Sequence, residues 1–229
     1  MTATPPQERL NKYLALQLGI SRREADELIE RKKVTVNNIP ATLGGRFTTG
    51  DLIMVNNKAV TADASMQYIL FNKPVGYVCS RKAQGDNPTI YALLPNEFST
   101  LKPVGRLDKD SSGLILLSND GDFAFRMTHP KFNKKKVYHV QLDHPLEPLH
   151  QQMISDFGVQ LEDGKSQFIV SRIDDHPTYE IIMTEGRNRQ IRRTFSALGY
   201  EVTKLHRVQF GNYSLNDLKS GTFVATVVL

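Results

Sequence analysis

The sequence predicts an α+β protein in which a small module of helices and short strands precedes a larger domain with a mixed, mainly antiparallel β-sheet. One observation is a pair of amphipathic helical segments confined to the region before residue 34. Another is that short runs of β-branched, aromatic and aliphatic residues dominate from Gln67 onward, with few helical stretches between them. Strand and helix alternate too irregularly for a doubly wound sheet, which favours the α+β class.

Two helices are predicted at the start of the chain. Leucines recur every four residues in the first helix and form one apolar stripe, which Gly19 ends. These leucines are Leu10, Leu14 and Leu18. Ser21 and Glu24 have the spacing of a capping box, in which each side chain satisfies a backbone amide at the start of the second helix. The buried side of this helix is predicted to carry Ala25, Leu28 and Ile29.

Short strands are predicted to follow at residues 34–36 and 51–55, with a turn at Asn37-Asn38. Residues 1–57 therefore form the predicted N-terminal module, the small polar stretch 58–66 a linker, and residues 67–229 the larger domain. The strands of the larger domain are predicted at 68–71, 114–118, 137–142, 168–173, 179–184, 202–208 and 222–228. Its helices are predicted at 123–128, 148–157 and 188–198.

Composition excludes several classes of protein. The hydrophobic content of 40% and charged content of 23% are those of a soluble globular chain. No apolar run approaches the roughly 18 residues that span a bilayer, so no membrane association is expected. The N-terminus lacks a basic head and an apolar signal core, which indicates a cytoplasmic protein. The single Cys79 excludes an internal disulfide or a thiolate metal cluster.

Clustered basic residues favour RNA as a partner. The net charge is +5, which is mild, so the distribution of charge matters more than its sum. The clusters are Arg22-Arg23, Arg31-Lys32-Lys33, Lys134-Lys135-Lys136, and the set Arg187, Arg189, Arg192 and Arg193. One isolated run is ordinarily a solvated surface, but several clusters at the edges of predicted elements indicate nucleic-acid binding.

The turn from Gly105 to Gly113 carries the most informative acidic residue, Asp108, directly after Gly105-Arg106-Leu107. It leads into the apolar run 114–117, which predicts a buried strand. A carboxylate in such a turn either caps backbone amides or acts as a nucleophile, and the residues alone leave both open.

Other interpretations of this turn are weaker. The pattern from Asp108 to Gly113 imitates the start of a calcium loop, but its twelfth position is Asn119 instead of a glutamate. In phosphotransferases that form an aspartyl phosphate, the paired aspartates follow a strand, whereas here they precede one. The six histidines show no paired-ligand spacing, so we expect neither a metal nor a cofactor.

The helix predicted at 188–198 separates its arginines by face. At about 100° per residue, Ile191 clusters with other apolar residues on the core side, while Arg189 and Arg193 lie opposite and are free to meet phosphates. Arg192 falls at the boundary, where its stem can be buried while its guanidinium reaches a carboxylate. An ion pair of purely structural function is the alternative.

Several segments together resemble the ribosomal RNA pseudouridine synthases, in the branch of small-subunit and related large-subunit enzymes. The segments are Phe71–Val78 with its N-K-P turn, Gly105-Arg106-Leu107-Asp108, Lys136-Val137-Tyr138, and Glu185–Arg193. The resemblance implies that Asp108 is the nucleophile, that Tyr138 lies against the target base and that Arg192 sits beside the aspartate. It gives Asp110 no chemical role. Tyr138 could instead simply pack in a half-buried strand.

The residues that the resemblance and the basic clusters mark as RNA contacts in this domain are Arg106, Lys136, Arg189, Ile191 and Arg193. The N-terminal module resembles the S4 RNA-binding domain in its L-N-K-Y-L, S-R-R-E-A-D and G-D-x-I-x-V segments. Its candidate phosphate contacts are Arg9, Lys12, Arg22, Arg23, Arg31, Lys32 and Lys33. This module is expected to supply affinity and placement, because every candidate catalytic residue follows Gln67.

The resemblance implies a monomeric isomerase that converts a uridine of ribosomal RNA to pseudouridine and needs no cofactor. The stretches 105–115 and 188–205 look closest to the large-subunit members, which act on 23S rRNA. The small-subunit enzyme, acting on 16S rRNA, is the alternative. A non-catalytic RNA-binding protein is a further alternative, but it has no need for Asp108, Tyr138 and Arg192 together.

Overall fold

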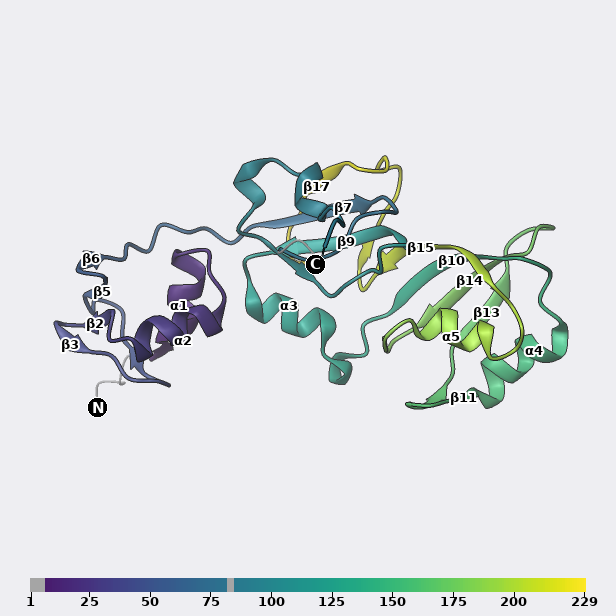
Figure 1. The fold of residues 1–229 in the computed structure, drawn as a ribbon, viewed down its shortest axis with the longest axis horizontal. Helices are drawn as coiled ribbons and strands as arrows, with labels where there is room; N and C mark the ends of the chain where they lie inside the picture. The colour runs from purple at the N-terminus through teal and green to yellow at the C-terminus, as the bar shows by residue number, and fades with distance from the viewer. Residues whose placement is uncertain (1–6, 82–84) are drawn as a thin grey trace. The chain divides into compact units, whose positions relative to one another are not determined.

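The computed structural model describes residues 7–81 and 85–229, which divide into two compact units on either side of the Met66–Gln67 bond. The N-terminal unit begins with β1 (Glu8–Arg9), α1 (Leu10–Gln17) and α2 (Arg22–Glu30). Its strands β2 (Val34–Val36), β3 (Ile39–Pro40), β5 (Ile53–Val55) and β6 (Lys58–Ala59) form an antiparallel sheet in the order β3-β2-β5-β6. A separate pair joins β1 to β4 (Arg46–Phe47). Figure 1 labels the helices α1 and α2 and the strands β2, β3, β5 and β6 of this unit.

Local sequence signals account for most of this unit. The predicted capping box is present, because the Ser21 hydroxyl accepts from the Glu24 amide at 3.1 Å and the Glu24 carboxylate accepts from the Ser21 amide at 2.6 Å. Asn37 and Asn38 both have positive φ, which produces the tight turn between β2 and β3. The helix α1 ends at Gln17, so Leu18 lies outside the buried stripe and is 39% exposed, contrary to the prediction.

The structure differs from the predicted linker at residues 58–66. Asn56 and Asn57 also have positive φ and turn the chain directly into β6, which pairs with β5. Val60 accepts a hydrogen bond from the Tyr13 hydroxyl at 3.1 Å, so the chain remains attached to the N-terminal unit beyond Ala59. A two-residue strand has too little sequence pattern to be recognised without its partner.

The second unit is built on a nine-stranded sheet whose main path runs β13-β14-β10-β15-β9-β7-β17, with β16 beside β15 and β8 beside β9. The strands are β7 (Tyr68–Lys73), β8 (Lys102–Val104), β9 (Ser112–Ser118), β10 (Lys136–Leu142), β13 (Ile169–Arg172), β14 (Thr178–Met183), β15 (Val202–Phe210), β16 (Tyr213–Ser214) and β17 (Phe223–Ala225). Only the β9–β15 pair is parallel among the described strands of this sheet. The α+β fold with a mainly antiparallel sheet is therefore confirmed.

Both faces of the central strands are buried. Ile115 and Leu117 of β9 belong to one apolar cluster, whereas Leu114 and Leu116 belong to another that includes Phe123 of a helix. This two-sided burial explains why residues 114–117 form a continuous apolar run.

The described helices of this unit are α3 (Gly121–Thr128), α4 (Pro148–Gln152), which continues as the π-helical turn Met153–Phe157, and α5 (Gln190–Ser196). Short 3-10 turns occupy Ile90–Leu93, Asn96–Phe98 and Pro130–Phe132, and a hairpin joins β11 (Val159–Leu161) to β12 (Gly164–Ser166).

The parallel contact between β9 and β15 depends on Gly113. Its φ is +104°, and a Cβ atom there would lie 2.3 Å from the backbone oxygen of Arg207. A glycine is therefore required where the two strands pass each other.

None of the helices in the described part of the chain is long and apolar enough to span a membrane.

Candidate active site

The turn that carries Asp108 is wrapped around a buried lysine. Lys73 at the end of β7 has 0% exposed surface, and its ammonium donates to the backbone oxygens of Asp108 at 3.0 Å and Ser111 at 2.6 Å. A third bond goes to the oxygen of Pro74 at 3.0 Å. Burial lowers the pKa of Lys73, partly offset by the nearby Cys79, Asp110 and Asp108. The carbonyl oxygens thus replace the water that a buried ammonium would lose.

The Asp108 side chain is held less tightly than the backbone around it. Its carboxylate accepts no hydrogen bond among the described residues, and its nearest recorded cation is Arg189, whose Nη1 lies 3.7 Å from Oδ2. The side chain is 36% exposed. An aspartate that capped the turn would accept backbone amides, so the geometry speaks against the capping interpretation.

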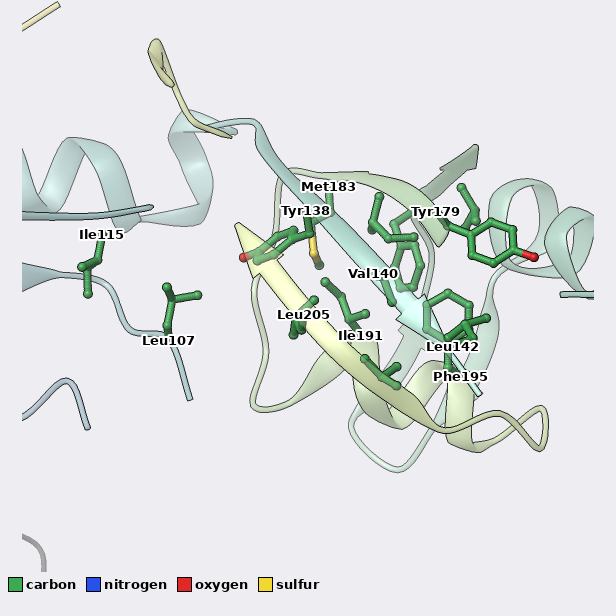
Figure 2. Packing of buried hydrophobic residues seen from close by; sticks show 14 of the residues in the cluster. Leu107, Ile115, Tyr138, Val140, Leu142, Tyr179, Met183, Ile191, Phe195 and Leu205 are labelled. Carbon is green, nitrogen blue, oxygen red and sulfur yellow. The ribbon is translucent and has the colours of Figure 1, made fainter. Parts of the chain in front are cut away.

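Asp108 lines a pocket of about 280 Å³ together with Tyr138 of β10 and Ile191 of α5. Tyr138 is 8% exposed, and it lies among the apolar side chains of Met183, Leu205 and Ile191 (Figure 2). The pocket is therefore apolar along this wall and polar where Asp108 stands. The structure brings these sequence-predicted residues together from segments far apart in the chain.

The recorded contacts of Arg192 are with Val202 and Asp110, and no ion pair with Asp108 is recorded among the described residues. Its Nη1 donates to the oxygen of Val202 at 2.6 Å, its Nη2 donates to the oxygen of Asp110 at 3.0 Å, and its Nε lies 3.3 Å from Oδ2 of Asp110. The arginine next to Asp108 is Arg189, one helical turn earlier. The boundary position on α5 gave the guanidinium its reach toward a carboxylate, but the carboxylate is that of Asp110.

Arg189 also has a carboxylate partner. Both of its terminal nitrogens donate to the Asp110 carboxylate at 3.1 Å, in a paired arrangement. Partial burial would raise the pKa of Asp110, but the bonds from Arg189 and the charge of Arg192 lower it. Asp110, which the resemblance left without a role, therefore joins both arginines to the Asp108 turn.

Arg193 also has a partner. Its guanidinium makes paired hydrogen bonds of 3.0 and 2.7 Å to Asp163, in the hairpin between β11 and β12. Arg187 contacts the same carboxylate at 3.0 Å and donates to the oxygens of Gly164 and Lys165. These arginines fix the hairpin to the start of α5.

The remaining predicted RNA contacts of this unit, Lys136 and Arg106, both line the pocket. Lys136 Nζ donates to the oxygens of Thr184 and Glu185 at 3.1 and 3.2 Å. Burial, followed by the charge of Arg207, lowers the pKa of Lys136 to about 8. Arg106 is exposed.

Sequence reasoning did not single out Lys73 and Arg207, two buried cations at this site. Lys73 lies within the quoted N-K-P segment, and a lysine inside an otherwise apolar strand was the available signal. Arg207 similarly interrupts the strand 202–208 and lines the pocket. No group of three or more potential metal ligands is present among residues 7–81 and 85–229.

In the N-terminal unit, most candidate phosphate contacts are at the surface. Those exposed are Arg9, Arg22, Arg23, Arg31, Lys32 and Lys33, whereas Lys12 is half-buried. Arg22 donates to the side chain of Asn11 at 3.2 Å. The exposed set surrounds both ends of α2 and the end of β1, and so leaves basic groups accessible to a polyanion.

Comparisons with known proteins match both units of the chain. The family model for RNA pseudouridylate synthase matches residues 67–197, and that for the S4 domain matches residues 8–53. The chain is 36% identical to the ribosomal large subunit pseudouridine synthase B of Bacillus subtilis (strain 168), over 93% of this chain and 90% of the relative. It is 35% identical to the ribosomal small subunit pseudouridine synthase A of Pasteurella multocida (strain Pm70), over 91% of each chain.

A solved structure of a pseudouridylate synthase aligns with a TM-score of 0.68 and 32% identity, covering 96% of each chain. Fold and site thus define an RNA-modifying isomerase with an added S4 domain. The chain belongs to the RNA pseudouridylate synthase family.

Proposed function

We propose that this enzyme converts a uridine of ribosomal RNA to pseudouridine, with Asp108 as the nucleophile. The observation that carries this proposal is a carboxylate that accepts no hydrogen bond among the described residues, at a pocket that Tyr138, apolar side chains and several cationic side chains also line. An unengaged carboxylate keeps its lone pairs available for attack. The printed names of the relatives from Bacillus subtilis and Pasteurella multocida support ribosomal RNA as the substrate.

The reaction is an isomerisation. The bond between N1 of uracil and C1′ of ribose breaks, the base turns, and C5 bonds to C1′; C5 loses a proton and N1 gains one. The uridine must first leave its base stack to reach a pocket of this kind. The Tyr138 ring then stacks on the uracil, and Asp108 attacks either C1′ or the uracil ring. Arg189, anchored by Asp110, places a positive charge 3.7 Å from the Asp108 carboxylate.

Replacement of one carboxylate oxygen tests the role of Asp108. Asp108→Asn preserves size but removes the charge and the nucleophilic oxygen, so it should fold and bind RNA yet form no detectable pseudouridine. Asparagine and aspartate serve almost equally as caps and in turns, so a capping residue would tolerate the change. Asp143→Asn, an exposed turn aspartate that accepts the Glu201 amide, is the matched control. Turnover by a folded Asp108→Asn variant would exclude the nucleophile.

We further propose that the target lies in large-subunit RNA, because the stretches 105–115 and 188–205 resemble that branch. The small-subunit RNA is the alternative, favoured by the 35% identity to the Pasteurella multocida enzyme. Pseudouridine mapping across both ribosomal RNAs, in a strain that lacks this gene and in the same strain complemented with wild type or Asp108→Asn, identifies the site. The missing modification should return only with the wild-type gene.

A further inference from the structure

Arg207 on β15 is a buried cation with an unused hydrogen-bond donor at the pocket. The residue is 2% exposed, and its Nε donates to the oxygen of Leu114 at 2.7 Å. Its Nη2 is buried and has no hydrogen-bond partner within the described residues. No ion pair between Arg207 and a carboxylate is recorded among the described residues. The arginine that pairs with the nearby Asp108 is Arg189.

Aromatic rings hold the Arg207 guanidinium in place. Its central carbon lies 4.9 Å from the ring centre of Phe210 and 6.0 Å from that of Tyr138. Tyr138 and Arg207 are also directly opposed in the pairing of β10 with β15. Ring faces attract a cation but do not neutralise its charge or accept both of its terminal amino groups. The guanidinium is therefore oriented while its buried Nη2 has no hydrogen-bond acceptor among the described residues.

A second positive group stands close by and increases the local need for an anion. Lys136 Nζ lies 5.7 Å from the ring centre of Phe210, the ring that Arg207 also contacts. The charge of Arg207 is one cause of the lowered pKa of Lys136. Two positive groups buried close together repel each other, and Glu185 offsets only part of the charge of Lys136, so the arrangement is unfavourable in the empty enzyme. A negative group that enters the pocket would offset this cost further.

The position within the pocket distinguishes between the anions that the RNA can offer. A phosphate is strongly hydrated and meets exposed cations such as Arg106 at the surface. Arg207 instead borders the apolar wall of Tyr138 and Leu205, which suits a planar base. During the reaction uracil gains negative charge on its carbonyl oxygens by either route. Attack at C1′ leaves the electron pair of the broken bond on the ring, and attack on the ring forms an enolate.

We propose that Arg207 binds a carbonyl oxygen of the displaced uracil and stabilises the negative charge that develops there. The inference rests on the proposed function and adds a catalytic residue to it. Arg207 supplies a fixed positive charge and a donor in a water-poor site, where such groups contribute most because they need no reorganisation. The charge disappears again when C5 has bonded to C1′ and N1 has taken up a proton.

The test separates binding from chemistry. Arg207→Gln keeps an amide that can bond to the Leu114 oxygen but removes the charge. Single-turnover conversion with saturating RNA should fall about 100-fold, the usual cost of losing one such donor, while the dissociation constant for RNA changes less than twofold. Arg172→Gln is the control, because Arg172 is exposed and bonds only to nearby backbone oxygens of Asp174 and Asp175.

Unchanged single-turnover conversion in folded Arg207→Gln would overturn the inference, and so would a loss confined to RNA affinity, which would indicate a phosphate contact. If Arg207→Gln does not fold, Arg207→Lys keeps the buried charge but cannot serve Leu114 and the uracil together. It should lose at least about tenfold in rate, and a wild-type rate would again overturn the inference. Lack of pseudouridine formation by the wild-type enzyme would instead contradict the proposed function.

Discussion

Lys73 and Asp108 are 35 residues apart in the chain, yet the Lys73 ammonium donates a 3.0 Å hydrogen bond to the Asp108 backbone oxygen. The same ammonium bonds to Ser111 and Pro74, so one buried group determines the path of the whole turn. The Asp108 side chain, by contrast, accepts no hydrogen bond among the described residues. A fixed backbone with a carboxylate open toward the pocket fits the nucleophile proposed above.

Lys73→Met should therefore destabilise the fold and displace the Asp108 turn. The substitution leaves several buried carbonyl oxygens without a donor, and we expect a loss of about 3 kcal/mol in the free energy of unfolding. Urea denaturation measures this loss. Lys219→Met, at an exposed lysine, is the control and should change stability by less than about 0.5 kcal/mol. An equally small effect at Lys73 would contradict its anchoring role.

Asp110→Asn should reduce activity, although sequence reasoning gave Asp110 no chemical role. The carboxylate holds Arg189 through paired 3.1 Å bonds and lies 3.3 Å from the Arg192 Nε. An asparagine offers one oxygen and no charge, so Arg189 loses its anchor beside Asp108. We expect about a tenfold fall in single-turnover rate, with little change in RNA affinity. Asp174→Asn, another exposed turn aspartate that accepts a backbone amide, is the comparison.

Much of the fold could be predicted because its signals are local. The Ser21–Glu24 capping box and the Asn37-Asn38 turn each lie within a few residues, and the α+β class follows from the period of the apolar pattern. The strand β6 was missed because two residues form a strand only through their partner β5. The exposure of Leu18 was missed because helix ends depend on tertiary packing.

The sequence predicted several of the residues that line the pocket, but not which arginine contacts which carboxylate. Asp108, Tyr138, Ile191 and Lys136 were all expected near the reaction and line one pocket. Which carboxylate each arginine reaches depends on the distance between the Asp108 turn and α5, which residue spacing on a helix does not contain. The same limit applies to Arg207, which the pairing of β15 with β9 and β10 brings to the pocket and for which no ion pair is recorded among the described residues.

Lys136 should make stability depend on pH. Its pKa falls from 10.5 to about 8 on folding, so between these values the unfolded chain binds more protons than the folded one. The free energy of unfolding contributed by this group therefore rises with pH from about 8 to 10.5, and the cost of burying the charge is fully present below 8. Urea unfolding of wild type and Lys136→Met at pH 7 to 10 should show wild type gaining on the variant as pH increases. A constant difference across this range would contradict the shift.

The N-terminal unit should contribute RNA affinity through phosphate contacts and leave the chemical step unchanged. Arg23 and Arg31 are exposed at opposite ends of α2, and neither side chain has a recorded hydrogen bond or ion pair within the described residues. A double variant, Arg23→Gln with Arg31→Gln, therefore removes charge without disturbing packing. If both contact phosphates of single-stranded RNA, the slope of log affinity against log salt should flatten by about 1.4, since each contact contributes about 0.7. The single-turnover rate at saturating RNA should stay at the wild-type value.

The control neutralises two cations of the other unit, Arg172→Gln with Lys219→Gln, and should leave the slope unchanged. A double variant at Arg23 and Arg31 with the wild-type slope would show that these arginines do not meet the RNA backbone.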